Sequence, residues 1–323
     1  MSVPYDETVL TSNPSNSSSP PSPAPRPSSR PVLRAGLGAA CISASAILVT
    51  LANMGPATAA FYRCALALPA LIPLAVIEQR RRGPRPLQTR LFALLAGLFL
   101  SVDLVLWNHS IADIGAGVAT VLGNLQVLFV ALLAWLVLKE RPGRRFLTML
   151  PVVFLGVVLV SGVVGGTAVG LHPSAGLGYG LGTSATYAVF LLIMRQKAGP
   201  GGQVAGQLAD ATAGSALGAL LLGLAFGGFQ FYLPWPSFGW LLMLALLSQT
   251  GGWLLITSSL PQLPAALSSL LLLLQPAASM VLAAIILGQR PTLLQVAGAV
   301  LVCGGVLAVA WVRSARSRPP VPA

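Results

Sequence analysis

The amino-acid sequence predicts an all-α integral membrane protein in which ten transmembrane helices form two inverted repeats of five helices each. Three observations predict this fold: an apolar composition, ten apolar stretches of spanning length, and an internal repeat. Hydrophobic residues make up 55% of the 323 residues and charged residues only 8%, whereas a soluble domain carries about 25% charged residues. So few charges could not keep a soluble protein hydrated, and the chain therefore belongs in a bilayer.

The chain begins with a segment that differs in composition from the rest. Residues 1–34 are rich in Ser and Pro and hold few large apolar side chains. Such a segment cannot bury enough apolar surface to offset the entropy cost of ordering, so a disordered tail is predicted. No small-residue cleavage site follows the first apolar stretch, which is expected to remain as an uncleaved anchor. Residues 313–323 are predicted to form a short basic tail.

The predicted spans follow from the need for about 20 apolar residues in a helix that crosses a bilayer. The first repeat, residues 35–164, holds five such stretches, and the second repeat, residues 176–312, holds five more. The first five are 35–53, 57–78, 91–110, 115–138 and 145–164. The second five are 176–195, 204–226, 237–258, 264–287 and 293–312.

Basic residues indicate the orientation, because cytoplasmic loops carry an excess of Lys and Arg. With ten spans and both termini in the cytoplasm, 17 of the 19 basic residues fall on the cytoplasmic side. Arg290 lies in an outer loop and Arg63 lies within a span. The net charge of +12 is thus explained by topology. The sequence predicts a multi-pass protein of the cytoplasmic (plasma) membrane.

The internal repeat is the strongest functional signal from the residues themselves. Residues 125–142 align without gaps on residues 274–291 at an offset of 149, and 18 of 66 positions are identical across residues 95–160. Gln126 aligns with Gln275, and Gly156 aligns with Gly305. Because each copy holds an odd number of spans, the second copy must be inverted in the membrane. Inverted repeats are a signature of secondary transporters, which predicts transport by alternating access.

Several stretches also resemble a known family. The pattern of five plus five spans, the stretch FYRCALALP at 61–69, and the apolar runs that end in ERP (140–142) and QRP (289–291) resemble the EamA-type transporters of the drug/metabolite transporter (DMT) superfamily. The resemblance covers about residues 35–312. It implies a ten-helix bundle with a central cavity, made of two EamA-like repeats, whose usual task is export of small metabolites or amino-acid-like compounds. The chain departs from the family pattern at Val127 and Gln289.

Three charged residues lie inside predicted spans: Arg63, Asp103 and Asp210. A charge at the bilayer centre costs about 2.5–3.5 kcal/mol on insertion scales, so each is a candidate functional residue. At 1.5 Å per residue, Arg63 and Asp103 lie about 9 and 10 Å from the outer ends of their spans. They are expected to form an ion pair or to share a polar pocket. Trp107 shares a helix face with Asp103, and its indole can hold an ammonium group or simply pack in the core.

Other polar side chains recur on spans that the repeat relates. They are predicted to line a substrate-binding cavity, with interhelical hydrogen bonding as the alternative. These residues are Asn124, Gln126, Tyr187, Gln275 and Ser279. Asp103 and Asp210 are the candidates for coupling transport to protons. Asp210 lies near the inner end of its span, where its carboxylate can also snorkel towards water.

Rival functions find little support in the sequence. The chain has two histidines and no HExxH, GxSxG or Walker A motif, which argues against an enzyme and predicts no catalytic residues. Its three cysteines lack the spacing of a metal site, and its basic clusters lack the interleaved aromatics that bind nucleic acid.

The sequence therefore predicts a secondary transporter of small metabolites, an exporter of amino-acid-like or drug-like solutes, with proton coupling as one option. A small-molecule substrate and the lipid bilayer are its expected partners, and neither cofactor nor metal is expected. A membrane-embedded enzyme and an uncoupled facilitator or channel are the alternatives, and a homodimer is left open.

Overall fold

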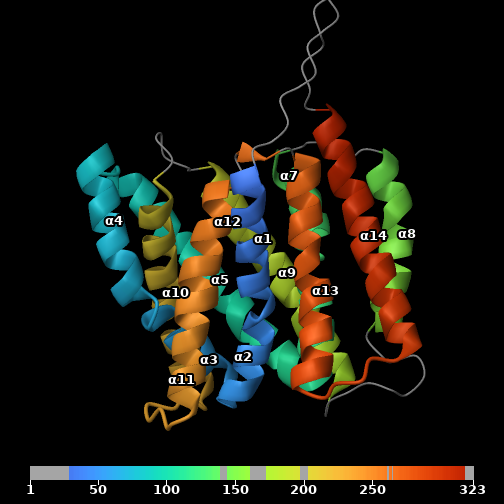
Figure 1. The fold of residues 1–323 in the computed structure, drawn as a ribbon, viewed down its shortest axis with the longest axis horizontal. Helices are drawn as coiled ribbons and strands as arrows, with labels where there is room; N and C mark the ends of the chain where they lie inside the picture. The colour runs from blue at the N-terminus through green and yellow to red at the C-terminus, as the bar shows by residue number, and fades with distance from the viewer. Residues whose placement is uncertain are drawn as a thin grey trace, which may run out of the picture.

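The computed structural model describes residues 29–138, 144–160, 172–196, 203–259, 262–263 and 265–316. Nearly all of these residues are helical, and no strand occurs among them. Figure 1 shows the helices side by side in one bundle. The predicted terminal tails lie largely outside the described residues. The first helix begins at Ser29, six residues before the predicted span, and Pro31 lies in its first turn, where the missing N–H removes no helical hydrogen bond.

The helices fall into two halves along the chain. The first half comprises α1 (Ser29–Ser43), α2 (Ser45–Ala52), α3 (Pro56–Ala65), α4 (Leu68–Arg82), α5 (Leu87–Ile114), α6 (Ala116–Gly123), α7 (Gln126–Leu138) and α8 (Arg144–Val160). The second half comprises α9 (Pro173–Gln196), α10 (Val204–Phe226), α11 (Ser237–Met243), the π-helix η1 (Leu244–Gly252), α12 (Trp253–Ser259), α13 (Ala265–Ile286) and α14 (Leu293–Arg316).

Some predicted spans consist of more than one helix. The first span is interrupted at Ala44, between α1 and α2, and the second is interrupted between α3 and α4. Pro69 lies in the first turn of α4, where its missing N–H leaves no helical bond unmade. The eighth span runs through α11, η1 and α12, so that nine residues in its middle are π-helical.

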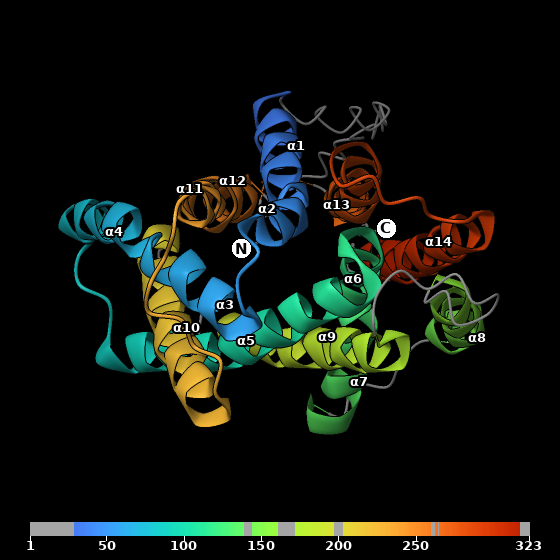
Figure 2. The same cartoon turned by 90° about the horizontal axis from the view of Figure 1, so that it is seen from below.

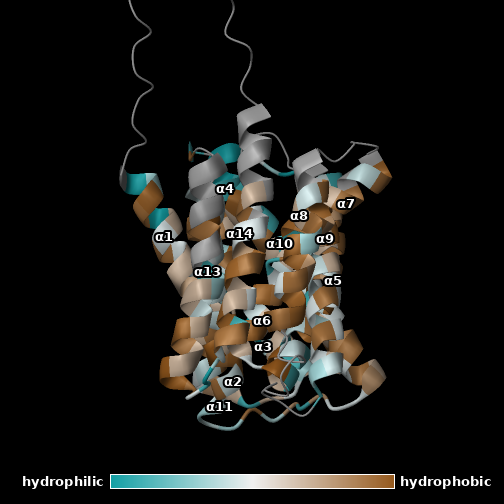
Figure 3. Ribbon diagram, turned by 90° about the vertical axis from the view of Figure 1, so that its right-hand side faces the viewer, coloured by the Kyte–Doolittle hydropathy of each residue, from teal (hydrophilic) through white to brown (hydrophobic). Residues whose placement is uncertain are grey.

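Among the residues that the structure describes, seven helical segments are long and apolar enough to cross a membrane. They are Arg30–Ala52, Pro56–Arg82, Leu87–Ile114, Ala116–Val137, Pro173–Met194, Val204–Phe226 and Ser237–Ser259. Three shorter apolar stretches, Leu147–Val160, Gln275–Ile286 and Leu293–Gly305, lie in α8, α13 and α14. Figure 3 shows hydrophobic residues along the helices and hydrophilic ones at the two ends of the bundle.

One end of the bundle carries most of the described basic residues. The start of α1 and the ends of α4 and α14 lie at this end, as Figure 1 shows. Arg30 and Arg34 belong to α1, and Arg80–Arg82 form the last turn of α4. Arg290 lies in the connection between α13 and α14 at the opposite end. We call the basic end the α1 end and the other the α3 end, because α3 begins there.

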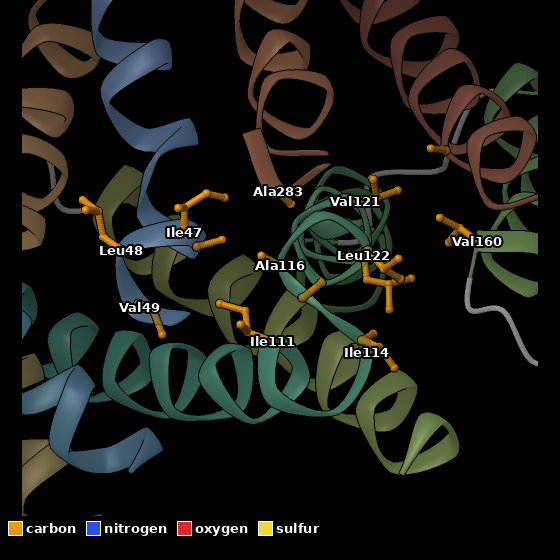
Figure 4. Close-up of a cluster of buried hydrophobic side chains, with 14 of the residues drawn as sticks. Ile47, Leu48, Val49, Ile111, Ile114, Ala116, Val121, Leu122, Val160 and Ala283 are labelled. Atoms are coloured by element: carbon orange, nitrogen blue, oxygen red, sulfur yellow. The ribbon is translucent and has the colours of Figure 1, made fainter. Parts of the chain in front are cut away.

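The largest apolar core packs the half of the bundle towards the α3 end. Residues Ile47–Val49 of α2 meet the last turns of α5, including Ile111 and Ile114, and the helix α6 with Val121 and Leu122. Figure 4 shows this cluster between α2, α5, α6 and α13, and Figure 2 shows the same helices from that end of the bundle. Burial of these side chains fixes the helices around the candidate site described below.

Glycines bring two pairs of helices into close contact. A Cβ on Gly97 of α5 would overlap the carbonyl of Ala211, and one on Gly214 of α10 would overlap the carbonyl of Leu94. The helices α8 and α14 also approach closely: a Cβ on Gly156 would lie 2.9 Å from the backbone nitrogen of Val302, and one on Gly305 would overlap the side chain of Val153. Small residues at such positions let helix backbones approach within van der Waals contact in a membrane.

Candidate functional site

The candidate site is built around Arg63, a buried arginine in the last turn of α3. Its side chain is only 5% exposed, although it lies within a predicted span. The Nε atom donates a hydrogen bond to Oε1 of Gln249 at 2.8 Å, and Nη1 donates to Oγ of Ser45 at 3.1 Å. Gln249 belongs to η1 in the second half, and Ser45 begins α2. Both halves of the chain therefore hold this guanidinium.

Asp103 of α5 supplies a carboxylate close to Arg63, and its side chain is 6% exposed. The Thr183 hydroxyl donates to the Asp103 backbone carbonyl at 2.8 Å. Arg63 interacts electrostatically with the carboxylate, but no N–O distance of 4.0 Å or less joins the two among the described residues. The direct ion pair that the depths allowed is therefore absent, because Arg63 turns to Gln249 and Ser45. The shared polar pocket is the alternative that fits the geometry.

Two aromatic side chains complete this group. The guanidinium carbon of Arg63 lies 5.9 Å from the ring centroid of Trp107, within the range of about 6 Å for a cation–π contact. Tyr187 of α9 interacts electrostatically with both Arg63 and Asp103, and its ring packs against Trp253 with centroids 6.1 Å apart. The structure thus brings together four residues that the sequence singled out: Arg63, Asp103, Trp107 and Tyr187.

A second polar group adjoins the first. Thr120 of α6 and Ser279 of α13 share a hydrogen bond of 3.1 Å between their hydroxyls, and Asn124 donates to the Thr120 carbonyl at 2.9 Å. The neighbouring Gly123 faces the Trp107 indole, whose Nε1 lies 3.9 Å from the position of a glycine Cβ. A hydrogen bond across helices, the alternative to cavity lining, is therefore present for Ser279, whereas the bond of Asn124 stays at the end of its own helix.

Gln126 and Gln275 occupy equivalent positions in the two copies of the repeat. Gln126 begins α7 and Gln275 lies in the middle of α13, next to Pro276. Both side chains are half-buried, and neither makes a side-chain hydrogen bond within the described part of the chain. Their place near the middle of the two related spans fits a cavity wall. Their contact with a substrate stays a prediction.

Both repeats of the sequence match a known protein family. The sequence pattern of the EamA-like transporter family matches residues 31–162 and residues 175–311, which together make up most of the chain. The chain belongs to the EamA-like transporter family. The two matched segments correspond to the two copies of the internal repeat. This EamA-like protein is therefore a multi-pass membrane transporter of small solutes, in a family of transporters rather than of enzymes.

Solved structures add a likeness in fold. No curated protein matches the chain, but 22 chains of solved structures do. One of these, described only as "Crystal structure of protein", has a TM-score of 0.59 and 15% sequence identity. The match covers 90% of this EamA-like transporter and 99% of the other chain. At that identity the likeness concerns the fold alone.

Asp210 lies apart from the Arg63 group in this EamA-like transporter. Its carboxylate lies 2.7 Å from Nη1 of Arg85 and 3.6 Å from Nε of Arg90. The shorter contact has the distance of an ion pair but not the angles of a hydrogen bond. Asp210 is mostly buried beside Arg85, so the alternative in which it snorkels freely to water is wrong. In the sequence, Arg85 and Arg90 indicate only the orientation in the membrane.

Gln249 is the functional candidate that sequence reasoning missed. It is 1% exposed and bridges Arg63 to the Thr212 hydroxyl, to which its Nε2 donates at 3.2 Å. An uncharged amide costs less in a span than a charge, so a search for charges passes over it. The signal lay in the run QTGG at 249–252, which interrupts an otherwise apolar span. The structure makes this run π-helical, a distortion common at functional sites.

Among the described residues, no group of three or more His, Cys, Asp and Glu side chains could hold a metal ion. What the Arg63 group offers is recognition of charge. The guanidinium can bind an anionic group, and the carboxylate with the Trp107 face can bind a cationic one.

Proposed function

We propose that this protein is a secondary transporter of the cytoplasmic membrane that exports amino-acid-like or drug-like small solutes by alternating access. The observation that carries the proposal is the buried Arg63 group, because both halves of a repeated chain contribute to it. Arg63, Asp103 and Trp107 come from the first copy, and Tyr187 and Gln249 come from the second. A midplane site at the interface of two inverted repeats is what alternating access requires.

Ten membrane crossings are part of this proposal. The seven spanning segments and the three shorter apolar stretches support it together with the internal repeat. An even number of crossings would place both termini on one side. The excess of basic residues at the α1 end favours the cytoplasm for that side, and the α3 end then faces the outside.

The chemistry of the site favours a solute that carries both signs of charge. Arg63 has hydrogen bonds from two of its nitrogens, and its third, Nη2, makes none among the described residues. This nitrogen is available for a carboxylate. Asp103 and the indole of Trp107 are available for an ammonium group. Asn124, Gln126, Gln275 and Ser279 would extend the wall of the same site.

Proton coupling is the finer part of the proposal, with Asp103 as the coupling residue. Its carboxylate faces the site and is not held by an ion pair, so it can accept a proton on one side of the membrane and release it on the other. Asp210, the other candidate, is held by Arg85 and Arg90. Of the two acids, Asp103 is therefore the one placed to exchange a proton together with solute.

Efflux from liposomes tests the proposal. Liposomes that contain the full-length protein are loaded with the twenty common amino acids, and release of each is measured by mass spectrometry against protein-free liposomes. We expect accelerated release of at least one. Asp103→Asn should lower that release about tenfold or more, since a hydrogen bond to a charged group contributes about 1.5–3 kcal/mol. Asp113→Asn, which removes an acid ten residues further along α5, is the matched control.

Two results would count against the proposal. Release no faster than from protein-free liposomes would exclude amino acids as substrates. Unchanged release by Asp103→Asn would exclude Asp103 from the site. A pH gradient imposed across the same liposomes tests coupling separately: equal rates with and without the gradient would leave uncoupled, facilitated efflux as the mechanism.

A further inference from the structure

At each end of the bundle, a loop of one half docks on a helix of the other half. At the α1 end, the loop after α4 docks on the start of α10. The Gln203 side chain donates to the Gly83 carbonyl at 2.9 Å, and the Gly206 amide donates to Glu78 at 2.8 Å. Arg85 lies against Gly206 and pairs with Asp210 at 2.7 Å. This group is called the ionic latch.

At the α3 end, the loop after α10 docks on the start of α3. The Gln230 amide donates to the Thr58 hydroxyl at 3.0 Å, and the Tyr62 hydroxyl donates to the Phe231 carbonyl at 2.8 Å. Phe229 stacks on Tyr62 with ring centroids 6.4 Å apart. This group is called the aromatic latch. Here the second half supplies the loop and the first half supplies the helix, which is the reverse of the arrangement at the α1 end.

The two latches use equivalent positions. Gln203 and Gly55 are the N-cap residues of α10 and α3. Counted from these caps, Asp210 and Tyr62 both stand at the seventh residue of the helix. Each loop begins at a glycine C-cap with similar dihedral angles: Gly83 has φ 85° and ψ 171°, and Gly227 has φ 81° and ψ 175°. Arg85 and Phe229 are each the second residue after that glycine. An ion pair at one end thus corresponds to a ring stack at the other.

The candidate site lies between the latches and touches the elements of both. Tyr62 of the aromatic latch precedes Arg63 in α3. Arg63 is hydrogen-bonded to Gln249, and Gln249 is hydrogen-bonded to Thr212 of α10. Thr212 stands two residues after Asp210 of the ionic latch. Through its two hydrogen bonds, Gln249 therefore links α3, which carries Tyr62, to α10, which carries Asp210.

We propose that Gln249 is a positioning residue that couples the two latches, so that opening of one end holds the other end closed. The proposal rests on the transport function proposed above, because only a transporter needs its two ends to open in turn. Gln249 can act in this way because its amide binds Arg63 with the oxygen and Thr212 with the nitrogen. If loss of the Asp210–Arg85 ion pair lets α10 shift, Thr212 moves with the helix and Gln249 with it. The hydrogen bond from Arg63 to Gln249 then changes, and so does the position of the neighbouring Tyr62.

A native cysteine reports on both ends without any substrate. Cys64 follows Arg63, is fully buried, and can react only after the bundle opens. In a Cys41→Ala, Cys303→Ala background of the full-length chain, the rate of Cys64 labelling by a membrane-impermeant maleimide is measured in right-side-out and inside-out vesicles. Asp210→Asn and Arg85→Gln remove the charges of the ionic latch, and Tyr62→Phe removes the hydrogen bond that the hydroxyl makes in the aromatic latch.

Coupled latches give reciprocal changes in labelling. Asp210→Asn should raise labelling from the cytoplasmic side and lower it from the outside, and Tyr62→Phe should do the reverse. Changes of about fivefold or more are expected, as for other coupled sites. When Gln249→Ala is added to either variant, the rate of Cys64 labelling should still rise from the side that the variant opens. Labelling from the opposite side should no longer fall. Arg81→Ala and Tyr232→Phe, which alter exposed residues at the same two ends, should change neither rate.

The outcomes separate coupling from transport. A rise in labelling from both sides at once, or a reciprocal change that persists in the Gln249→Ala background, would overturn the coupling by Gln249. If the ion pair is the element that opens, the double variant Asp210→Asn, Arg85→Gln should change the labelling rates as much as Asp210→Asn alone. Reciprocal labelling in a protein that releases no solute would instead contradict the proposed function and leave the coupling intact.

Discussion

Asp103 shows how a single residue can break the symmetry of a repeated scaffold. At the offset of 149, its counterpart in the second copy is Gly252. Gly252 packs against α1, and a Cβ there would lie 2.8 Å from Cγ1 of Ile42 and 3.3 Å from Cβ of Cys41. The second copy thus uses this position for close helix packing and has no room for an acid. Only the first copy can place a carboxylate beside Arg63.

The sequence predicted which residues belong to the Arg63 group better than it predicted the hydrogen bonds that hold Arg63. Depth in the membrane and helical spacing placed Arg63, Asp103 and Trp107 in one region, since both depend only on local geometry. The partners of Arg63 could not be predicted in the same way. Gln249 lies 186 residues further along the chain, and its approach depends on how the two halves pack. The same reason hid the pairing of Asp210 with Arg85.

Replacement of Gln249 by Leu tests the anchoring of Arg63 at the level of stability. The substitution keeps the volume but leaves Nε of Arg63 and the Thr212 hydroxyl without this partner. A buried polar group that loses its hydrogen bond costs about 1–3 kcal/mol, so thermal unfolding of the purified protein in detergent should shift to lower temperature. Gln79→Leu, at an exposed position near the end of α4, should leave the unfolding temperature nearly unchanged. A similar temperature for both variants would show that Gln249 does not hold Arg63.

At the scale of the elements, apolar length predicted where helices occur but not where they are interrupted. The helical segments agree with the predicted spans within a few residues at most ends, since burial in a bilayer demands about 20 apolar residues per crossing. Apolar length gives no signal for the interruption at Ala44, whereas Pro69, in the first turn of α4, marks the interruption between α3 and α4. Pro73, Pro151 and Pro276 lie inside α4, α8 and α13 without ending these helices.

The contact between α5 and α10 depends on glycine, which gives a prediction at this scale. Gly214→Ala would place a methyl group against the Leu94 carbonyl, a backbone atom that cannot move away. Such overpacking typically costs about 1–3 kcal/mol. Gly178→Ala in α9 meets no atom within 4 Å and should stabilise the helix by about 0.5–1 kcal/mol. Unfolding temperatures of the two variants should therefore shift in opposite directions, and a shift in the same direction would contradict the packing of α5 on α10.

At the scale of the whole molecule, the contact between α8 and α14 relates the two copies directly. Gly156 faces the backbone of Val302, and Gly305 faces the side chain of Val153. At the offset of 149, Gly156 corresponds to Gly305 and Val153 corresponds to Val302. The two glycines are counterparts, and the two valines that they meet are counterparts as well. This is the pattern of a contact across a two-fold axis, and it is what an inverted repeat predicts for its fifth helices.

A designed disulfide tests this two-fold relation. The Cβ of Val153 lies 3.7 Å from the position of a Cβ on Gly305, and disulfides need Cβ atoms about 3.5–4.5 Å apart. In a variant without native cysteines, Val153→Cys with Gly305→Cys should cross-link under mild oxidation, and the linked peptides should appear by mass spectrometry after proteolysis. Val152→Cys with Gly305→Cys is the control, because the neighbouring side chain points elsewhere on α8. Parallel copies would not bring α8 and α14 together through equivalent positions in this reciprocal way, so equal cross-linking of both variants, or of neither, would refute the two-fold contact.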